Sequence, residues 1–89
     1  MKIIKRDFRI QNFSIEKLEN SILLPAKDLD MEVTEEDLTK IINSILSKLI
    51  KLRVYDDKTS VYELRGIVFE CLLLNDFKKL AYRYFDIIC

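Results

Sequence analysis

The sequence contains no histidine and no tryptophan, and it has only one glycine and one proline. Histidine is the usual general acid or base near neutral pH, and a phosphate-binding loop of the glycine-rich kind needs several glycines. The sequence also shows no metal-ligand cluster and no nucleophile beside a base, so it argues against an enzyme. The scarcity of helix breakers favours helix, and a hydrophobic content of 49% excludes a disordered tail.

Neither sign of charge is in excess, because 15 basic residues balance 15 acidic ones. A neutral chain has no overall field to attract a polyanion, so we expect no direct nucleic-acid partner. The two cysteines, Cys71 and Cys89, form neither a disulfide framework nor a metal-ligand spacing. No apolar run approaches the roughly 18 residues that cross a membrane. These absences predict a soluble, cytoplasmic protein with no membrane partner.

The length of 89 residues predicts a single domain, residues 1–89. Residues 2–6 and 9–13 alternate like short strands on either side of Asp7-Phe8, a connection that is typical of an antiparallel hairpin. An isolated hairpin is only marginally stable, so this one needs a helical layer to pack on. Residues 54–59 fit either a third strand of the same sheet or a loop.

Apolar residues with a period of 3.6 predict four helices, at residues 15–24, 35–52, 61–74 and 77–88. Ser14, Thr34 and Ser60 are suitable N-caps for the first three, and Asn75 or Asp76 begins the fourth. Pro25 is expected to end the first helix. The surest stripe, in the second helix, consists of Leu38, Ile41, Ile42, Ile45, Leu46, Leu49 and Ile50. The predicted fold is α+β, a small N-terminal antiparallel hairpin packed on about four helices.

The third predicted helix is apolar around most of its circumference, and Phe69 and Leu73 lie among its apolar residues. Such a helix is either the centre of its own fold or part of a contact with another chain. In the fourth helix, the predicted core face includes Phe85, whereas Tyr82 and Ile87 lie outside it. We therefore expect a homo-oligomeric or partner contact through the last two helices, with a purely internal role as the alternative.

Four short segments stand out in the order Ile3-Ile4-Lys5-Arg6-Asp7, Phe13-Ser14-Ile15-Glu16-Lys17-Leu18, Ser60-x-x-Glu63-Leu64 and Leu80-Ala81-Tyr82-Arg83-Tyr84-Phe85. Their order and spacing over nearly the whole chain resemble the ATP-cone family, the nucleotide-binding regulatory module of ribonucleotide reductases and their repressors. Each segment is weak alone, but together they are fairly specific.

The resemblance implies a cleft between the sheet and the helices that binds ATP or dATP as an allosteric effector. The regulated partner would be a ribonucleotide reductase or a related protein. Lys5 or Arg6, together with Lys17, would surround the phosphates, and Ile3 and Leu18 would lie against the base. Ser14 and Arg65 would lie near the nucleotide.

Each of these residues also has an ordinary structural interpretation. Lys5 and Arg6 are typical of charges on an exposed edge strand, Ser14 is first an N-cap, and Arg65 is typical of an exposed helical side chain. Lys17 is more informative, because a cation in the first turn of a helix opposes the helix dipole. A bound phosphate would remove that penalty.

The sequence departs from the family at three places, and the first of them, the loss of the hairpin glycine, supports an alternative. The alternative is a degenerate cone that binds no nucleotide and serves as a protein-interaction module. Phe8 stands where the family's hairpin has a glycine, and Gln11 stands where an acidic residue is frequent. The sequence also ends at Cys89, before a basic residue that some cones carry. Gly66, inside the third predicted helix, is expected to permit close helix packing.

Overall fold

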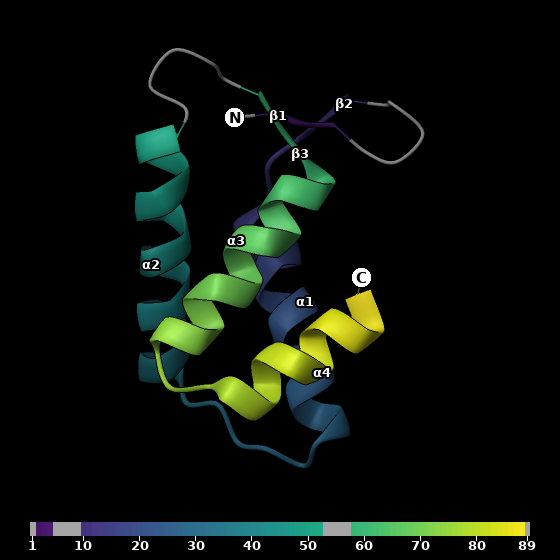
Figure 1. The fold of residues 1–89 in the computed structure, drawn as a ribbon, viewed down its shortest axis with the longest axis vertical. Helices are drawn as coiled ribbons and strands as arrows, with labels where there is room; N and C mark the ends of the chain where they lie inside the picture. The colour runs from purple at the N-terminus through teal and green to yellow at the C-terminus, as the bar shows by residue number, and fades with distance from the viewer. Residues whose placement is uncertain (1, 5–9, 53–57, 89) are drawn as a thin grey trace.

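The computed structural model describes residues 2–4, 10–52 and 58–88. Within these residues, a three-stranded sheet lies at one end of four helices (Figure 1). The elements in chain order are β1 (Lys2–Ile4), β2 (Ile10–Asn12), α1 (Ile15–Asp28), α2 (Glu35–Leu52), β3 (Lys58–Ser60), α3 (Val61–Leu74) and α4 (Lys78–Ile88). The predicted α+β class with four helices is confirmed. None of the helices in the described ranges has the length and apolar character that a membrane crossing requires.

The sheet has the order β2-β1-β3 and mixed strand directions. β1 pairs antiparallel with β2, where Ile3 lies opposite Gln11, and parallel with β3, where Ile3 lies opposite Thr59. The hairpin expectation is thus corrected to a mixed sheet, and its parallel pair was not predicted. Parallel strands need a long crossover, and here α1 and α2 provide it. Asp7-Phe8, the predicted connection, lies outside the described residues.

The first three helices begin at the predicted N-caps. The Ser14 hydroxyl accepts a hydrogen bond from the Lys17 backbone N–H at 3.3 Å, and the Ser60 hydroxyl accepts one from the Glu63 N–H at 3.0 Å. Thr34 acts in the same way at the start of α2, with a distance of 3.1 Å. Each cap satisfies a backbone donor that has no partner within its helix, so local sequence fixed these three starts.

The prediction that Pro25 ends the first helix is wrong, because α1 continues through it to Asp28. Pro25 lacks the N–H that would bond to the Ser21 carbonyl, which is a cost in the middle of a helix. However, Pro25 is buried and shares the core face of α1 with Leu18 and Ile22. Burial of this face offsets the lost hydrogen bond. The expectation that proline ends a helix considers only the backbone, so it does not take the free energy of this burial into account.

Helices α1 and α3 end in the same way, with an aspartate in the left-handed conformation. Asp30 has φ 56° and Asp76 has φ 65°. After α3, the N–H of Phe77 bonds to the Leu72 carbonyl at 2.9 Å, and the N–H of Asp76 bonds to the Leu73 carbonyl at 3.2 Å. This is a Schellman arrangement, which satisfies the last carbonyls of the helix.

The prediction that Asn75 or Asp76 begins the fourth helix is therefore wrong. Both residues belong to the end of α3, where Asn75 is the C-cap. α4 begins at Lys78, and the Phe77 carbonyl accepts the N–H of Ala81 at 2.8 Å. Asparagine and aspartate favour helix starts and also tolerate positive φ, so residue type alone predicted the wrong end.

The core lies between the four helices, and each contributes fully buried side chains. These include Ile22, Ile41, Ile45, Leu49, Val68, Leu72, Leu80 and Tyr84. Ile50 and Phe85, predicted on core faces, are instead 70% and 53% exposed, and Tyr82 and Ile87 are exposed as predicted. Ile50 lies in the last turn of α2, and the Phe85 ring lies 5.6 Å from the Phe69 ring at the border of the α3–α4 contact.

Gly66 does not permit a close helix approach, contrary to the prediction. Apart from its chain neighbours and the backbone of its own helix, a Cβ atom at this exposed position would meet no atom of the described residues within 4 Å. We expect Gly66→Ala to raise the free energy of unfolding by about 0.5–1 kcal/mol, because glycine costs conformational entropy inside a helix. Urea denaturation measures the change. A loss of stability would instead show that another chain packs against this position.

Candidate functional site

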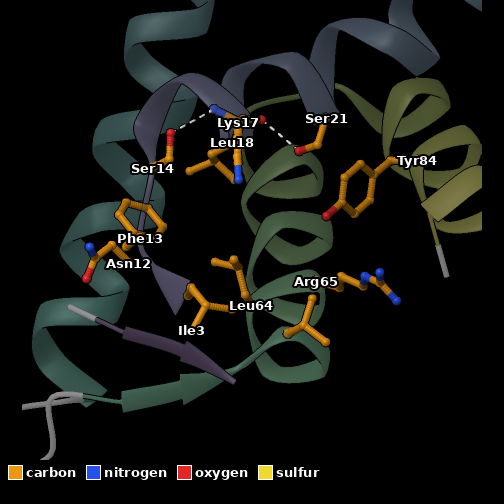
Figure 2. A pocket seen from close by; sticks show the side chains of 11 residues that line it. Ile3, Asn12, Phe13, Ser14, Lys17, Leu18, Ser21, Leu64, Arg65 and Tyr84 are labelled. Carbon is orange, nitrogen blue, oxygen red and sulfur yellow. Dashed lines mark hydrogen bonds between the residues drawn. The ribbon is translucent and has the colours of Figure 1, made fainter. Parts of the chain in front are cut away.

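A cavity of about 240 Å³ lies where the sheet meets the first turns of α1 and α3 (Figure 2). Its wall is formed by side chains from β1, the end of β2, α1, α3 and α4, whereas none of the described lining residues comes from α2 or β3. The lining residues are Ile3, Asn12, Phe13, Ser14, Lys17, Leu18, Ser21, Val61, Leu64, Arg65 and Tyr84.

α1 presents one face to the cavity, through Ser14, Lys17, Leu18 and Ser21. These positions follow the spacing i, i+3, i+4 and i+7, which places them on one side of a helix. The Ser21 hydroxyl donates to the Leu18 carbonyl at 2.7 Å, so its proton is engaged within the helix. Figure 2 shows the Lys17 side chain directed from the first turn of α1 into the cavity. The cation that opposes the helix dipole is therefore also a wall of this cavity.

Apolar side chains form the side of the cavity that faces the sheet. Ile3 on β1 is only 6% exposed, and Leu64 and Val61 on α3 line the wall beside it. On the neighbouring strand, the Asn12 side-chain oxygen accepts a hydrogen bond from the Lys2 ammonium. The cavity thus combines an apolar wall with polar groups on α1 and β2, the arrangement that small-molecule sites commonly have.

Among the described residues, the charged side chains that line the cavity are both cationic. They are Lys17 and Arg65, and none of the described lining side chains is a carboxylate. Arg65 is held to one side, because its guanidinium carbon lies 6.0 Å from the centre of the Tyr62 ring. Figure 2 shows the Arg65 head directed away from the middle of the cavity. A site with this charge favours an anionic ligand.

Comparison with known proteins gives the family. The model of the ATP cone domain matches residues 1–87 of the chain. The chain belongs to the ATP cone family. No curated protein sequence matches it. ATP cones are nucleotide-binding regulatory modules, and an anion-favouring cavity with an apolar wall is consistent with that general role.

Five of the seven site residues predicted for this ATP cone line one cavity. They are Ile3, Ser14, Lys17, Leu18 and Arg65. Lys5 and Arg6, the other two, lie outside the residues that the structure describes. Tyr62, which sequence reasoning also considered as a ring against the base, is 61% exposed and does not line the cavity.

Sequence reasoning missed three polar residues of the cavity, Asn12, Ser21 and Tyr84. Ser21 had a usable signal, since it lies seven residues after Ser14 on the same helical face. Tyr84 falls on the apolar stripe of α4, where it reads as core, and indeed it is only 2% exposed. Among the described residues, no group of three or more acidic or cysteine side chains is placed to hold a metal ion.

Proposed function

We propose that this ATP cone binds ATP or dATP in the cavity and acts as a cytoplasmic, non-enzymatic regulator. The nucleotide is an effector that changes the activity of a partner or the association state of the cone itself. The observation that carries the proposal is the position of Lys17, a cation at the first turn of α1. It is directed into a cavity whose described lining residues include no carboxylate.

The proposed orientation follows from the chemistry of the walls. Phosphate oxygens interact with the Lys17 ammonium and the positive end of the α1 dipole, and Ser14 caps that same end. The adenine ring lies against apolar side chains, with Ile3 and Leu18 as the nearest candidates. Lys5 or Arg6 adds charge at the phosphates, and Arg65 reaches them by leaving Tyr62. The regulated partner is a ribonucleotide reductase or a related protein.

Calorimetric titration with ATP, dATP and GTP tests this proposal. We expect saturable binding of ATP and dATP and weaker binding of GTP. The guanine edge presents N–H donors at N1 and N2, and no carboxylate among the described lining residues is there to accept them. A ligand at 100 times its Kd stabilises a protein by about 2.7 kcal/mol, which a thermal shift detects. If millimolar ATP and dATP give neither heat nor a shift, the degenerate-cone alternative replaces the proposal.

We further propose that the response includes association with a second copy through the outer face of α3 and α4. At this face the Phe69 ring lies 5.6 Å from both the Tyr82 and the Phe85 rings. Phe85 is 53% exposed, although aromatic side chains usually bury most of their area. Leu74, at the end of α3, is 65% exposed. An exposed cluster of this kind is typical of a contact between proteins.

Phe85→Ser is expected to abolish a dATP-dependent rise in molecular mass, which light scattering at several protein concentrations measures. Serine removes an exposed ring of the outer face. Ile50→Ser is the control, since Ile50 is also apolar and is 70% exposed, but lies on α2. Association that survives in Phe85→Ser and is lost in Ile50→Ser would place the contact on α2. A wild-type chain that is monomeric with and without dATP would end this proposal.

A further inference from the structure

Arg65 belongs to the cavity wall, but its charged head contacts a residue outside the cavity. On α3 it lines the cavity together with Val61 and Leu64, which precede it by four residues and by one. Its guanidinium carbon lies 6.0 Å from the centre of the Tyr62 ring, which belongs to the same helix three residues earlier. Side chains three apart on a helix are neighbours. The Arg65 head can therefore reach either the ring or the cavity by rotation of its side chain alone.

The empty cavity gives a physical reason for the Arg65 head to stay at the ring. Lys17 is directed into the same cavity, and none of the described lining side chains is a carboxylate that could compensate a second cation (Figure 2). Two like charges in one cavity repel each other. The face of the Tyr62 ring attracts a guanidinium instead, and this ring is 61% exposed and does not line the cavity.

A bound phosphate reverses this preference. A bidentate contact between arginine and phosphate is among the strong hydrogen bonds, whereas a cation over an exposed aromatic ring is held only weakly. Negative charge in the cavity also removes the repulsion between Lys17 and Arg65. The Arg65 head is thus expected to lie at Tyr62 in the free protein and at the phosphates in the complex.

We propose that Tyr62 is a positioning residue, which holds Arg65 out of the cavity until a phosphate group binds beside Lys17 and thereby lowers the affinity for the nucleotide. This inference rests on the proposed function, because it takes a nucleotide as the ligand. Tyr62 itself does not contact the ligand. It sets the affinity through the free energy that is needed to release Arg65.

Tyr62→Leu tests the inference, because it removes the ring and keeps an apolar side chain that favours helix. We expect the affinity for ATP, measured by calorimetry, to rise about two- to fivefold, which corresponds to the loss of one exposed cation–π contact. Tyr62→Phe keeps the aromatic face and should keep the affinity of the wild type. The affinity for adenosine, which has no phosphate, should be the same in all three proteins.

Arg65→Ala provides the second half of a double-mutant cycle. Alone, it should lower the affinity for ATP. Adding Tyr62→Leu to it should then change nothing, because no guanidinium is left to release. If Tyr62→Leu raises the affinity equally with and without Arg65, the ring obstructs the ligand directly and the inference is overturned. A lower affinity in Tyr62→Leu would overturn it as well, since the ring would then support binding.

The proposed function and this inference can fail separately. If Lys17→Ala weakens ATP binding and Arg65→Ala does not, the cavity binds the nucleotide without Arg65, and only the inference fails. If the wild type binds neither ATP nor dATP, the proposed function fails and the inference fails with it.

A second measurement needs no variant of Tyr62. In wild-type protein with isotopically labelled tyrosine rings, ATP should shift the Tyr62 resonances, although this ring does not line the cavity, because Arg65 leaves it. Adenosine should shift them much less, and in Arg65→Ala the difference between the two ligands should disappear. Equal shifts of Tyr62 with ATP and adenosine in the wild type would contradict the inference.

Discussion

Replacing Leu72 by Ala is expected to lower the free energy of unfolding by about 2–5 kcal/mol, because it leaves a cavity among side chains that cannot fully close around it. Leu72 is completely buried in α3, which packs against both α2 and α4. It also supplies the carbonyl that accepts the Phe77 N–H at the end of the helix. A chain of 89 residues has a total stability of about 4–13 kcal/mol, so this single loss is a large share of the total.

Leu74→Ala is the matched control, made on the same helix two residues later. Leu74 is 65% exposed, so its truncation should change the free energy of unfolding by no more than about 0.5 kcal/mol. Urea denaturation followed by circular dichroism measures both variants. Similar losses for Leu72→Ala and Leu74→Ala would mean that α3 does not present the face described above to the core.

Replacing Lys17 by Ala is expected to weaken ATP binding about tenfold or more, since a charge-assisted contact contributes roughly 1.5–3 kcal/mol. The same substitution should raise the stability of the protein without nucleotide by about 0.3–1 kcal/mol, because it removes a cation from the positive end of α1. A residue that only supports the fold would change binding and stability in the same direction. Calorimetry and urea denaturation on one preparation give both quantities.

Lys79→Ala is the control for the combination expected of Lys17→Ala, weaker ATP binding together with higher stability. Lys79 is also an exposed cation in the first turn of a helix, α4, but it does not line the cavity. Its replacement should give a similar small gain in stability and leave the affinity for ATP unchanged. If Lys79→Ala weakens ATP binding as much as Lys17→Ala does, the effect comes from the overall charge of the chain and not from the cavity.

The parts of the fold that sequence reasoning found are those that local chemistry decides. Ser14 and Ser60 bond to backbone groups three residues away, and such contacts can be read from the chain itself. The errors depend on neighbours that are distant in sequence. Pro25 stays inside α1 because the core accepts it. The choice between strand and loop, which the sequence left open for residues 54–59, is decided in the same way, since Thr59 belongs to a strand that pairs with β1.

The same distinction applies to the candidate site. Lys17 was predicted as a site residue because a cation in the first turn of a helix opposes the helix dipole, and this unfavourable position can be recognised from the sequence alone. Tyr84 gave no such signal, because an aromatic residue on a core stripe looks the same whether its hydroxyl faces a cavity or the surface. Its place in the cavity wall appears only when α4 is packed beside α1 and α3.

The parallel pairing of β1 with β3 affects how the protein folds as it is synthesised. Lys2 pairs with Lys58, so about 55 residues must emerge from the ribosome between the two partners. At a synthesis rate of 5–20 residues per second, several seconds pass in which β1 can pair only with β2. A two-stranded hairpin alone is only marginally stable in water. Pairing of β1 with β3 is also slow, because closing so long a segment costs conformational entropy before the two strands make contact. The cavity, whose wall extends from Ile3 to Tyr84, therefore takes shape only after nearly the whole cone has been made.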